Sequence, residues 1–196
     1  MSFGTGLVNI DQYAFYNCPE LQAVVFRECD TPLLSIGVYA FANAVKLTTL
    51  SFSETLKSIA YGAFSGCISL TSLTLPDSLT ALYGGGYGNN GAFSGCTSLK
   101  SIHLGNGLVT IGNGNSVGSD RDPDVYAYCG VFGNCSSLET VEFNQKLVTI
   151  GHHAFSECIA IKTLTLPDSV QTIGYNAFYH NTALSSVSFG RELQAK

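Results

Sequence analysis

Apolar residues recur along this chain in one pattern of 23 residues. The clearest copy starts at Ala154-Phe155, and the next starts at Ala177-Phe178. The unit reads Ala-Phe-x-x-Cys-x-x-Leu-x-x-Leu-x-Leu-x-x-x-Leu-x-x-Ile-Gly-x-x. Its Leu-x-Leu pair has the two-residue period of a β-strand, whereas no segment keeps a 3.6-residue period for the length of a helix. The pattern therefore predicts short strands and no long helix.

Seven phenylalanines mark copies of this unit: Phe15, Phe41, Phe64, Phe93, Phe132, Phe155 and Phe178. The steps between them are 26, 23, 29, 39, 23 and 23 residues. The excesses over 23 are 3, 6 and 16 residues, which place insertions near 29–32, 83–91 and 112–130. Five copies carry a cysteine three residues after the Phe: Cys18, Cys67, Cys96, Cys135 and Cys158.

Stacked copies can bury apolar positions that a single copy cannot. Each residue of one copy then lies on its equivalent in the next, and the interior becomes a set of ladders. We therefore predict a single domain over residues 1–196, a β-rich repeat solenoid with Phe, Cys and Leu ladders. The Phe-x-x-Cys-x-x-Leu stretch is expected to make one short helical turn.

The unit resembles the BspA-like, treponemal-type leucine-rich repeat, whose motif is close to Leu-x-x-Ile-x-Leu-Pro-x-Ser-Leu-x-x-Ile-Gly-x-x-Ala-Phe-x-x-Cys. Residues 164–178 match it almost throughout, and the resemblance covers about 7–189. It implies a right-handed leucine-rich repeat superhelix of about seven repeats. It also implies a protein of the cell surface or secreted, used for adhesion and for binding host or partner proteins, with no enzymatic activity and no cofactor. The sequence departs from the motif at 83–91 and 112–130.

Charge and hydropathy argue against two classes of partner. The formal net charge is −5 and the sequence has no basic cluster, which argues against nucleic acid. Hydrophobic residues make up 45% of the chain, but no apolar run is long enough to span a bilayer. No signal peptide is visible, and neither end resembles a capping repeat. We expect the chain to be part of a longer protein, and its open ends allow end-to-end self-association.

The seven cysteines suggest disulfides or a metal site, but a structural role is the better interpretation. Neighbouring ladder cysteines would have parallel side chains, which is poor disulfide geometry. The same position accepts Ala44 and Asn181, so it asks for a small side chain. Cys29 and Cys129 lie outside the ladder and too far apart to bond, and Cys129 is a candidate exposed thiol. No Cys-x-x-Cys occurs, which disfavours zinc.

No combination of residues indicates catalysis or metal binding. The four histidines have no triad partner, and the Gly-rich stretch 83–91 lacks the Gly-Lys-Ser/Thr of a phosphate loop. Asp120, Asp122 and Asp124 alternate as in a calcium loop, but the Gly and acid that an EF-hand requires are replaced by valines. A solvated loop is the better interpretation, and we predict no metal.

The insertions at 83–91 and 112–130 are candidates for a ligand-binding surface. Both fall between the Ile-Gly and Ala-Phe positions of consecutive repeats, so they should be neighbours on one face. They carry Tyr83, Tyr87, Tyr126 and Tyr128 among Gly, Asn and Ser, a composition typical of binding loops. Tolerated drift is the alternative, because long surface insertions cost little stability.

The outward residues of the predicted strands form a second candidate surface. Ser and Thr dominate it, and His103 and Glu142 lie in neighbouring repeats of one row. It suits a protein or glycan partner, or it is a solvated face filled by residues that favour strands. The sequence thus predicts a non-catalytic protein-binding or adhesion module. The alternative is a structural spacer within a larger surface protein.

Overall fold

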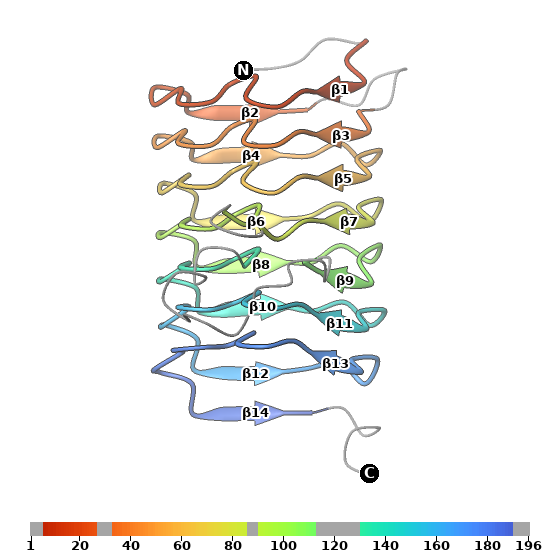
Figure 1. Cartoon of the computed structure of the whole chain (residues 1–196), viewed down its shortest axis with the longest axis vertical. Helices are drawn as coiled ribbons and strands as arrows, with labels where there is room; N and C mark the ends of the chain where they lie inside the picture. Colours follow the sequence, from red (N-terminus) through yellow and green to blue (C-terminus); the bar gives the residue numbers. More distant parts are fainter. Residues whose placement is uncertain (1–5, 27–32, 86–89, 113–129, 190–196) are drawn as a thin grey trace.

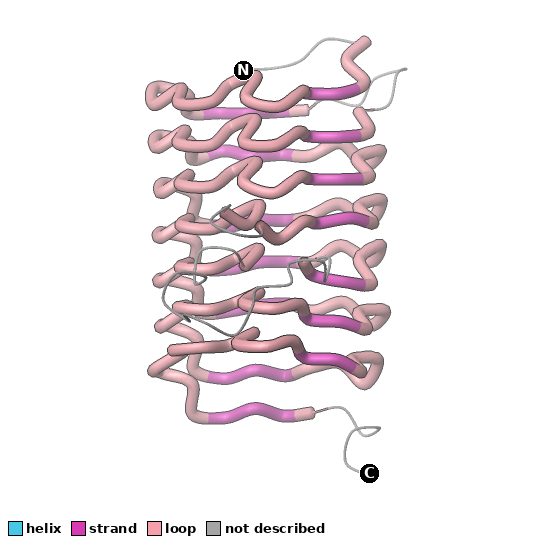
Figure 2. The backbone as a smooth tube through the Cα atoms, in the orientation of Figure 1, coloured by secondary structure: helices cyan, strands magenta, loops and turns pink. Residues whose placement is uncertain are grey.

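The chain winds into a solenoid whose coils contain two short strands each (Figure 1). The computed structural model describes residues 6–26, 33–85, 90–112 and 130–189, and none of these residues is helical (Figure 2). Odd-numbered strands run to the left in the nearer layer, even-numbered strands run to the right in the farther layer, and the chain descends (Figure 1). The coil is therefore right-handed, and the predicted leucine-rich repeat solenoid is confirmed.

The strands of the nearer layer contain two residues each: β1 (Asn9–Ile10), β3 (Ser35–Ile36), β5 (Ser58–Ile59), β7 (Ala81–Leu82), β9 (Thr110–Ile111), β11 (Thr149–Ile150) and β13 (Thr172–Ile173). Those of the farther layer contain three: β2 (Ala23–Val25), β4 (Thr49–Ser51), β6 (Ser72–Thr74), β8 (Ser101–His103), β10 (Thr140–Glu142), β12 (Thr163–Thr165) and β14 (Ser186–Ser188). The even-numbered strands coincide with the Leu-x-Leu pairs of the repeat.

All strand pairs are parallel, and their register follows the spacing of the repeats. Ser35 pairs with Ser58 across a normal 23-residue step. Ser72 pairs with Ser101 across the 29-residue step, and Ser101 pairs with Thr140 across the 39-residue step. The two longer insertions therefore leave the strand register unchanged, because the extra residues lie wholly between strands.

The core is a column of phenylalanine rings that runs along the solenoid axis. Consecutive rings from Phe15 to Phe178 stack with centroids 5.0–5.7 Å apart and planes within 16° of parallel. The five central rings are fully buried: Phe41, Phe64, Phe93, Phe132 and Phe155. Phe15 and Phe178, in the end coils, are partly buried. Each stacked pair adds about 0.5–1.5 kcal/mol to the stabilisation from burial alone.

The segment around each Phe is a pair of turns, so the expected short helical turn is wrong. The residues two before and two after the Phe have positive φ, as at Tyr13 and Asn17 or at Gly62 and Gly66. Such a conformation interrupts a right-handed helix. It also turns backbone N–H groups towards the next coil: Phe41 donates to the Ala63 carbonyl at 2.8 Å. The backbone hydrogen bonds of this segment therefore connect coils.

Candidate binding face

The nearer layer of Figure 1 forms one continuous face, which we call the tyrosine face. It consists of the odd-numbered strands and the segment that follows each strand as far as the Cys position. In described residues these ranges are 9–18, 35–44, 58–67, 81–85, 90–96, 110–112, 130–135, 149–158 and 172–181. The even-numbered strands form the opposite face.

Every tyrosine of the chain belongs to the tyrosine face or to an insertion that interrupts it. The chain has ten tyrosines. Seven lie on the described face: Tyr13, Tyr16, Tyr39, Tyr61, Tyr83, Tyr175 and Tyr179. The other three predicted ligand-binding tyrosines, Tyr87, Tyr126 and Tyr128, lie outside the described residues, within the two insertions. Tyr83 is 38% exposed at the start of the first insertion.

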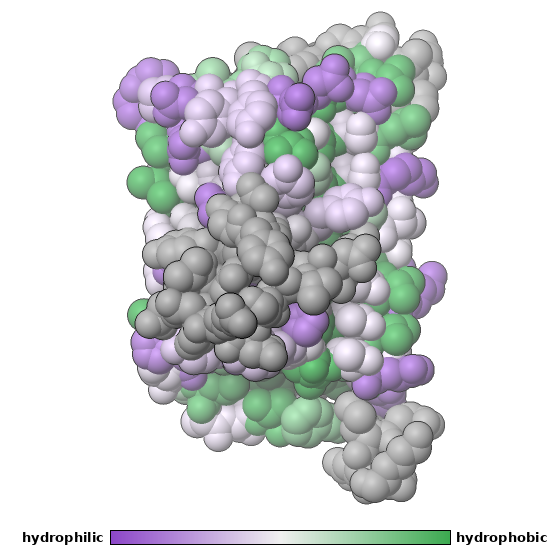
Figure 3. Space-filling view, in the orientation of Figure 1, coloured by the Kyte–Doolittle hydropathy of each residue, from purple (hydrophilic) through white to green (hydrophobic). Residues whose placement is uncertain are grey.

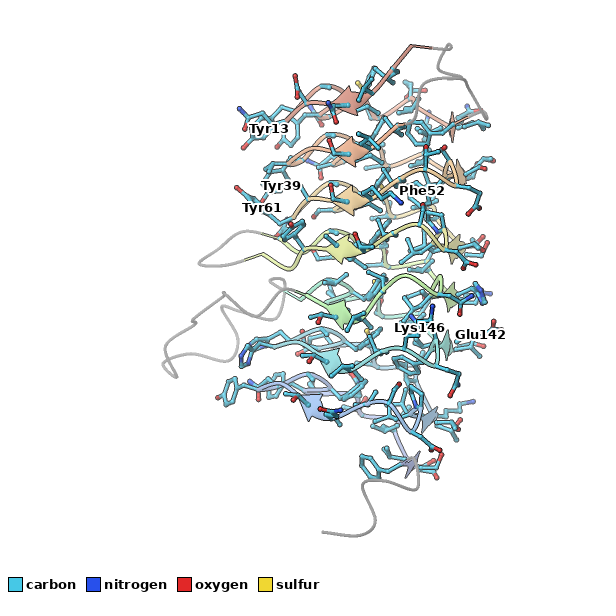
Figure 4. All side chains as sticks on the ribbon, turned by 90° about the vertical axis from the view of Figure 1, so that its right-hand side faces the viewer. Tyr13, Tyr39, Phe52, Tyr61, Glu142 and Lys146 are labelled. Carbon is cyan, nitrogen blue, oxygen red and sulfur yellow. The ribbon has the colours of Figure 1, made fainter. Side chains whose placement is uncertain are left out.

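Four tyrosines of the first three coils form a tyrosine cluster: Tyr13, Tyr16, Tyr39 and Tyr61. Tyr13 stacks on Tyr39 with ring centroids 5.7 Å apart. Tyr16 meets both rings edge-on, and Tyr61 meets Tyr39 edge-on at 5.8 Å. Tyr13 is 51% and Tyr16 47% exposed. Tyr13, Tyr39 and Tyr61 follow one another down this side of the stack (Figure 4). Pale surface of intermediate hydropathy covers the upper part of the face (Figure 3).

Tyr39 connects the cluster to the end of the first insertion. Its hydroxyl oxygen accepts a hydrogen bond from the backbone N–H of Asn90 at 3.0 Å. The Asn90 side-chain amide donates to the Ser65 hydroxyl at 2.8 Å. Its ring also lies over Gly62, where any side chain would overlap it. The cluster therefore positions the residue at which the insertion returns to the solenoid.

The ends of the two longer insertions meet on this face. Gly91 and Gly130 pack so closely that a Cβ on Gly91 would overlap the Gly130 carbonyl. One residue further along, Phe93 donates its backbone N–H to the Val131 carbonyl at 2.8 Å. The insertions thus start and end in neighbouring coils beside the tyrosine cluster.

A second aromatic group lies on the same face in the last two coils. The His153 and Tyr175 rings meet edge-on at 5.8 Å, and the Tyr175 N–H donates to His152 Nδ1 at 2.8 Å. Burial and, secondarily, the neighbouring His152 lower the pKa of His153. Tyr175 is 50% exposed. This group is therefore uncharged near neutral pH at His153 and presents an aromatic surface.

The tyrosine face carries almost no charge. Within its described ranges the acidic residues are Asp11 and Glu157, and none is a lysine or an arginine. Glu157 accepts a 2.7 Å contact from His180 Nδ1. All described lysines lie in the turns beside the face or at the starts of strands. Ionic attraction therefore contributes little to any partner of this face.

The structure places His103 and Glu142 on the opposite face, next to each other. The two side chains project from β8 and β10, and His103 Nδ1 lies 2.7 Å from Glu142 Oε2. Both are more than half exposed. In the nearby turns Asp77 accepts two hydrogen bonds from Asn106, and these bonds lower the pKa of the exposed Asp77 carboxyl. Glu142 and the tyrosines project from opposite sides (Figure 4), so the six predicted ligand-binding residues do not form one site.

The described cysteines are free thiols, and four of them are buried in the core. The Sγ atoms of Cys67, Cys96 and Cys135 each donate to the Phe carbonyl of the preceding coil at 3.4 Å, and Cys158 does so at 3.2 Å. Burial raises the pKa of Cys67 and Cys158 to about 12. Cys18 is half-buried, and Cys29 and Cys129 lie outside the described residues.

The rest of the described chain shows neither a metal-binding group nor a membrane helix. Within these residues, no three His, Cys, Asp or Glu side chains gather as metal ligands would. The same residues contain no helix with the length and apolar character to cross a bilayer.

Sequence reasoning did not single out Tyr13, Tyr16, Tyr39 and Tyr61. They occupy three different positions of the repeat, so a search for one conserved position does not group them. The shared signal is that all of them fall between the strand of the Ile-Gly pair and the Cys position, as do all seven described tyrosines.

Comparison with protein families gives one match. The model of the BspA type leucine-rich repeat region matches six copies over residues 8–115 and 127–195. No curated protein matches the chain.

Solved structures show the same fold at low sequence identity. A leucine-rich repeat protein from T. pallidum aligns with a TM-score of 0.50 and 20% identity, over 82% of this chain and 77% of that one. A leucine-rich repeat protein from Bacteroides ovatus gives 0.42 and 20%, over 93% of this chain and 59% of that one. The pneumococcal vaccine antigen PcpA gives 0.38 and 18%, over 98% of this chain and 62% of that one. This chain therefore spans less than two thirds of the last two proteins.

Proposed function

Because the chain belongs to the BspA type leucine-rich repeat family, whose solenoids are generally non-enzymatic interaction modules, we propose that it is a protein-binding or adhesion module. The tyrosine face and its two insertions form the binding surface. The proposal includes a location at the cell surface or in the secreted fraction, which follows the family.

One observation carries the proposal: all ten tyrosines of the chain belong to one face or to its insertions. Tyr offers a large, rigid and amphipathic contact area at a low cost in side-chain entropy. It is also enriched at the centres of protein interfaces. A purely structural use of Tyr would not explain why three exposed rings, Tyr13, Tyr16 and Tyr175, are each about half exposed.

A structural spacer remains the competing function. The Ser and Thr residues on the even-numbered strands favour it, because they are good strand formers on a solvated surface. In a spacer the insertions would be drift and would bind nothing.

Deletion of the insertions separates the two functions. Removing residues 84–89 and 113–128 keeps Asn90, which bonds to Tyr39, and Gly130, which packs on Gly91. We expect this variant to keep the circular dichroism spectrum of the wild type. Both forms are then tested against an array of extracellular-matrix proteins and glycans.

Loss of at least one partner on deletion supports the binding module. Retention of every partner by the deleted form moves the site to the even-numbered strands. Failure of both forms to bind supports the spacer. The matched control is a double substitution on the opposite face, H103A with E142A, which should leave all binding unchanged.

A further inference from the structure

We propose that the tyrosine cluster binds an uncharged oligosaccharide. This inference deepens the proposed function and rests on it, since it names the ligand class for one part of the tyrosine face. It is carried by the arrangement of the cluster, by the polar groups around it and by the charge of the face.

The arrangement of the rings provides a surface for the C–H face of a sugar. Tyr16 stands edge-on to both Tyr13 and Tyr39, so its plane is nearly perpendicular to theirs, at 85° in each case. With 47% of its surface exposed, Tyr16 presents ring surface to solvent. The face of an aromatic ring is electron-rich and attracts the weakly positive C–H groups of a pyranose.

Polar groups around the rings can pair with sugar hydroxyls. The exposed side chains of Asp11, Gln12 and Asn17 come from the same coil as Tyr13 and Tyr16. Carboxylate and amide oxygens accept hydrogen bonds, and amide N–H groups donate them. A sugar hydroxyl does both. Apolar contact combined with a few polar groups is the usual composition of a site for a small ligand.

Charge excludes the anionic glycans. A sulfated or carboxylated polysaccharide requires Lys or Arg, because such ligands are held by charge-assisted hydrogen bonds. The described tyrosine face has neither residue, and Asp11 beside the cluster would repel an anion. A neutral sugar chain meets no such penalty.

The cluster also suits a chain of sugars lying along the solenoid axis. Tyr13, Tyr39 and Tyr61 come from three successive coils, and the Tyr13 and Tyr39 rings are 5.7 Å apart. An extended chain of β-linked pyranoses advances by a similar distance per sugar. Successive sugars would then meet successive coils and reach the end of the first insertion at Asn90.

Affinity electrophoresis in gels that contain a soluble polysaccharide tests the inference. The probes are hydroxyethylcellulose, laminarin, xylan and mannan, with heparin as the anionic probe. The variants are Tyr16→Ala, the double variant Tyr13→Ala with Tyr16→Ala, and Tyr16→Phe. Tyr175→Ala is the matched control, because Tyr175 is as exposed as Tyr16 but lies in the last coils of the same face.

We expect at least one neutral polysaccharide to retard the wild type. The double variant should bind it at least tenfold more weakly, Tyr16→Phe should stay within about threefold of wild type, and Tyr175→Ala should be unchanged. Circular dichroism of each variant shows that the fold is intact. Tyr39 is left unchanged because its hydroxyl holds Asn90.

Three results would overturn the inference: no retardation by any neutral probe, retardation by heparin alone, or equal retardation of wild type and double variant. The protein array described above distinguishes this failure from that of the proposed function. If a protein partner is lost on deletion of the insertions while no neutral probe retards the chain, the binding module stands and the sugar site is wrong. If neither assay detects binding, both are wrong.

Discussion

At the scale of single residues, the ladder cysteines do more than fill a small space. The sequence indicates only that a small side chain is needed, because Ala44 and Asn181 share the position. In the structure each buried thiol donates to a Phe carbonyl of the coil before it. Asn181 makes a different contact, since its side-chain oxygen accepts the Cys158 N–H at 2.9 Å. The chemistry of the position became visible only when neighbouring coils were placed.

Burial should protect the four thiols from alkylation. The thiolate is the reactive form, and burial raises the pKa of Cys96 and Cys135 well above the ordinary value. With iodoacetamide at pH 8, peptide mapping by mass spectrometry should find these two cysteines, Cys67 and Cys158 unmodified in the native protein. All four should be modified in 8 M urea, which is the control. Rapid modification in the native state would contradict the buried ladder.

The same thiols should make stability fall at high pH. Below about pH 9 they are protonated in both states. Between about 9 and 12 the unfolded chain loses these protons while folded Cys67 and Cys158, with a pKa of about 12, keep them. The folded state then binds more protons, so the free energy of unfolding falls by up to about 1.4 kcal/mol per pH unit for each thiol.

Urea denaturation at pH 8, 9 and 10 measures this slope. Substituting Cys67→Ala and Cys158→Ala together should make the slope shallower, since Ala occupies the same position at Ala44. An unchanged slope in the double variant would assign the effect to other groups.

At the scale of elements, the strands were predictable and the turns around Phe were not. The alternating pairs located every even-numbered strand, because one face of each strand is buried. The expected helical turn is replaced by two left-handed residues, one on each side of the Ala-Phe pair. The sequence held a signal for them, since Asn17, Asn43, Gly66, Gly95 and Asn134 stand two residues after the Phe. Glu157 and His180 adopt the same conformation without that composition.

The left-handed position predicts opposite effects for two small substitutions. Asn134 has φ of 57° and donates its N–H to the Ser156 carbonyl at 2.8 Å. Asn134→Ala should lower the free energy of unfolding by about 1 kcal/mol, because Ala tolerates this conformation less well. Asn134→Gly should stay within about 0.5 kcal/mol of wild type. Equal destabilisation by both in urea denaturation would indicate that the Asn side chain, and not the backbone conformation, is what matters.

At the scale of the whole molecule, the period of the sequence determined the architecture but not the functional face. Equal registers across 23-, 29- and 39-residue steps follow directly from the spacing of Phe. The tyrosine cluster could not be predicted from any single repeat. Tyr13, Tyr16 and Tyr61 occupy different positions of their own repeats, and the parallel stacking of coils brings them together. His103 and Glu142, which share one row of the repeat, were placed side by side correctly but away from the tyrosines.

Removing one coil should leave the fold intact. Deleting residues 155–177 joins Ala154 to Phe178 and preserves the Ala-Phe dipeptide and every later register. We expect the shape of the far-ultraviolet circular dichroism spectrum to be retained and the urea midpoint to fall, because each coil adds nearest-neighbour contacts. Deleting residues 155–165 is the matched control. It breaks the register and should abolish cooperative unfolding, and a folded product would contradict the ladder model.

The parallel pairing of each strand with the next coil has a consequence for how the chain folds during synthesis. Paired residues are 23 to 39 positions apart in sequence, wherever in the array they occur. Folding rates fall as the sequence separation of contacts grows, and here that separation does not increase with the number of coils. A coil can dock on its predecessor once at most 39 further residues have left the ribosome. The nascent chain therefore grows by adding coils at one end, and it never has to search for partners across its full length.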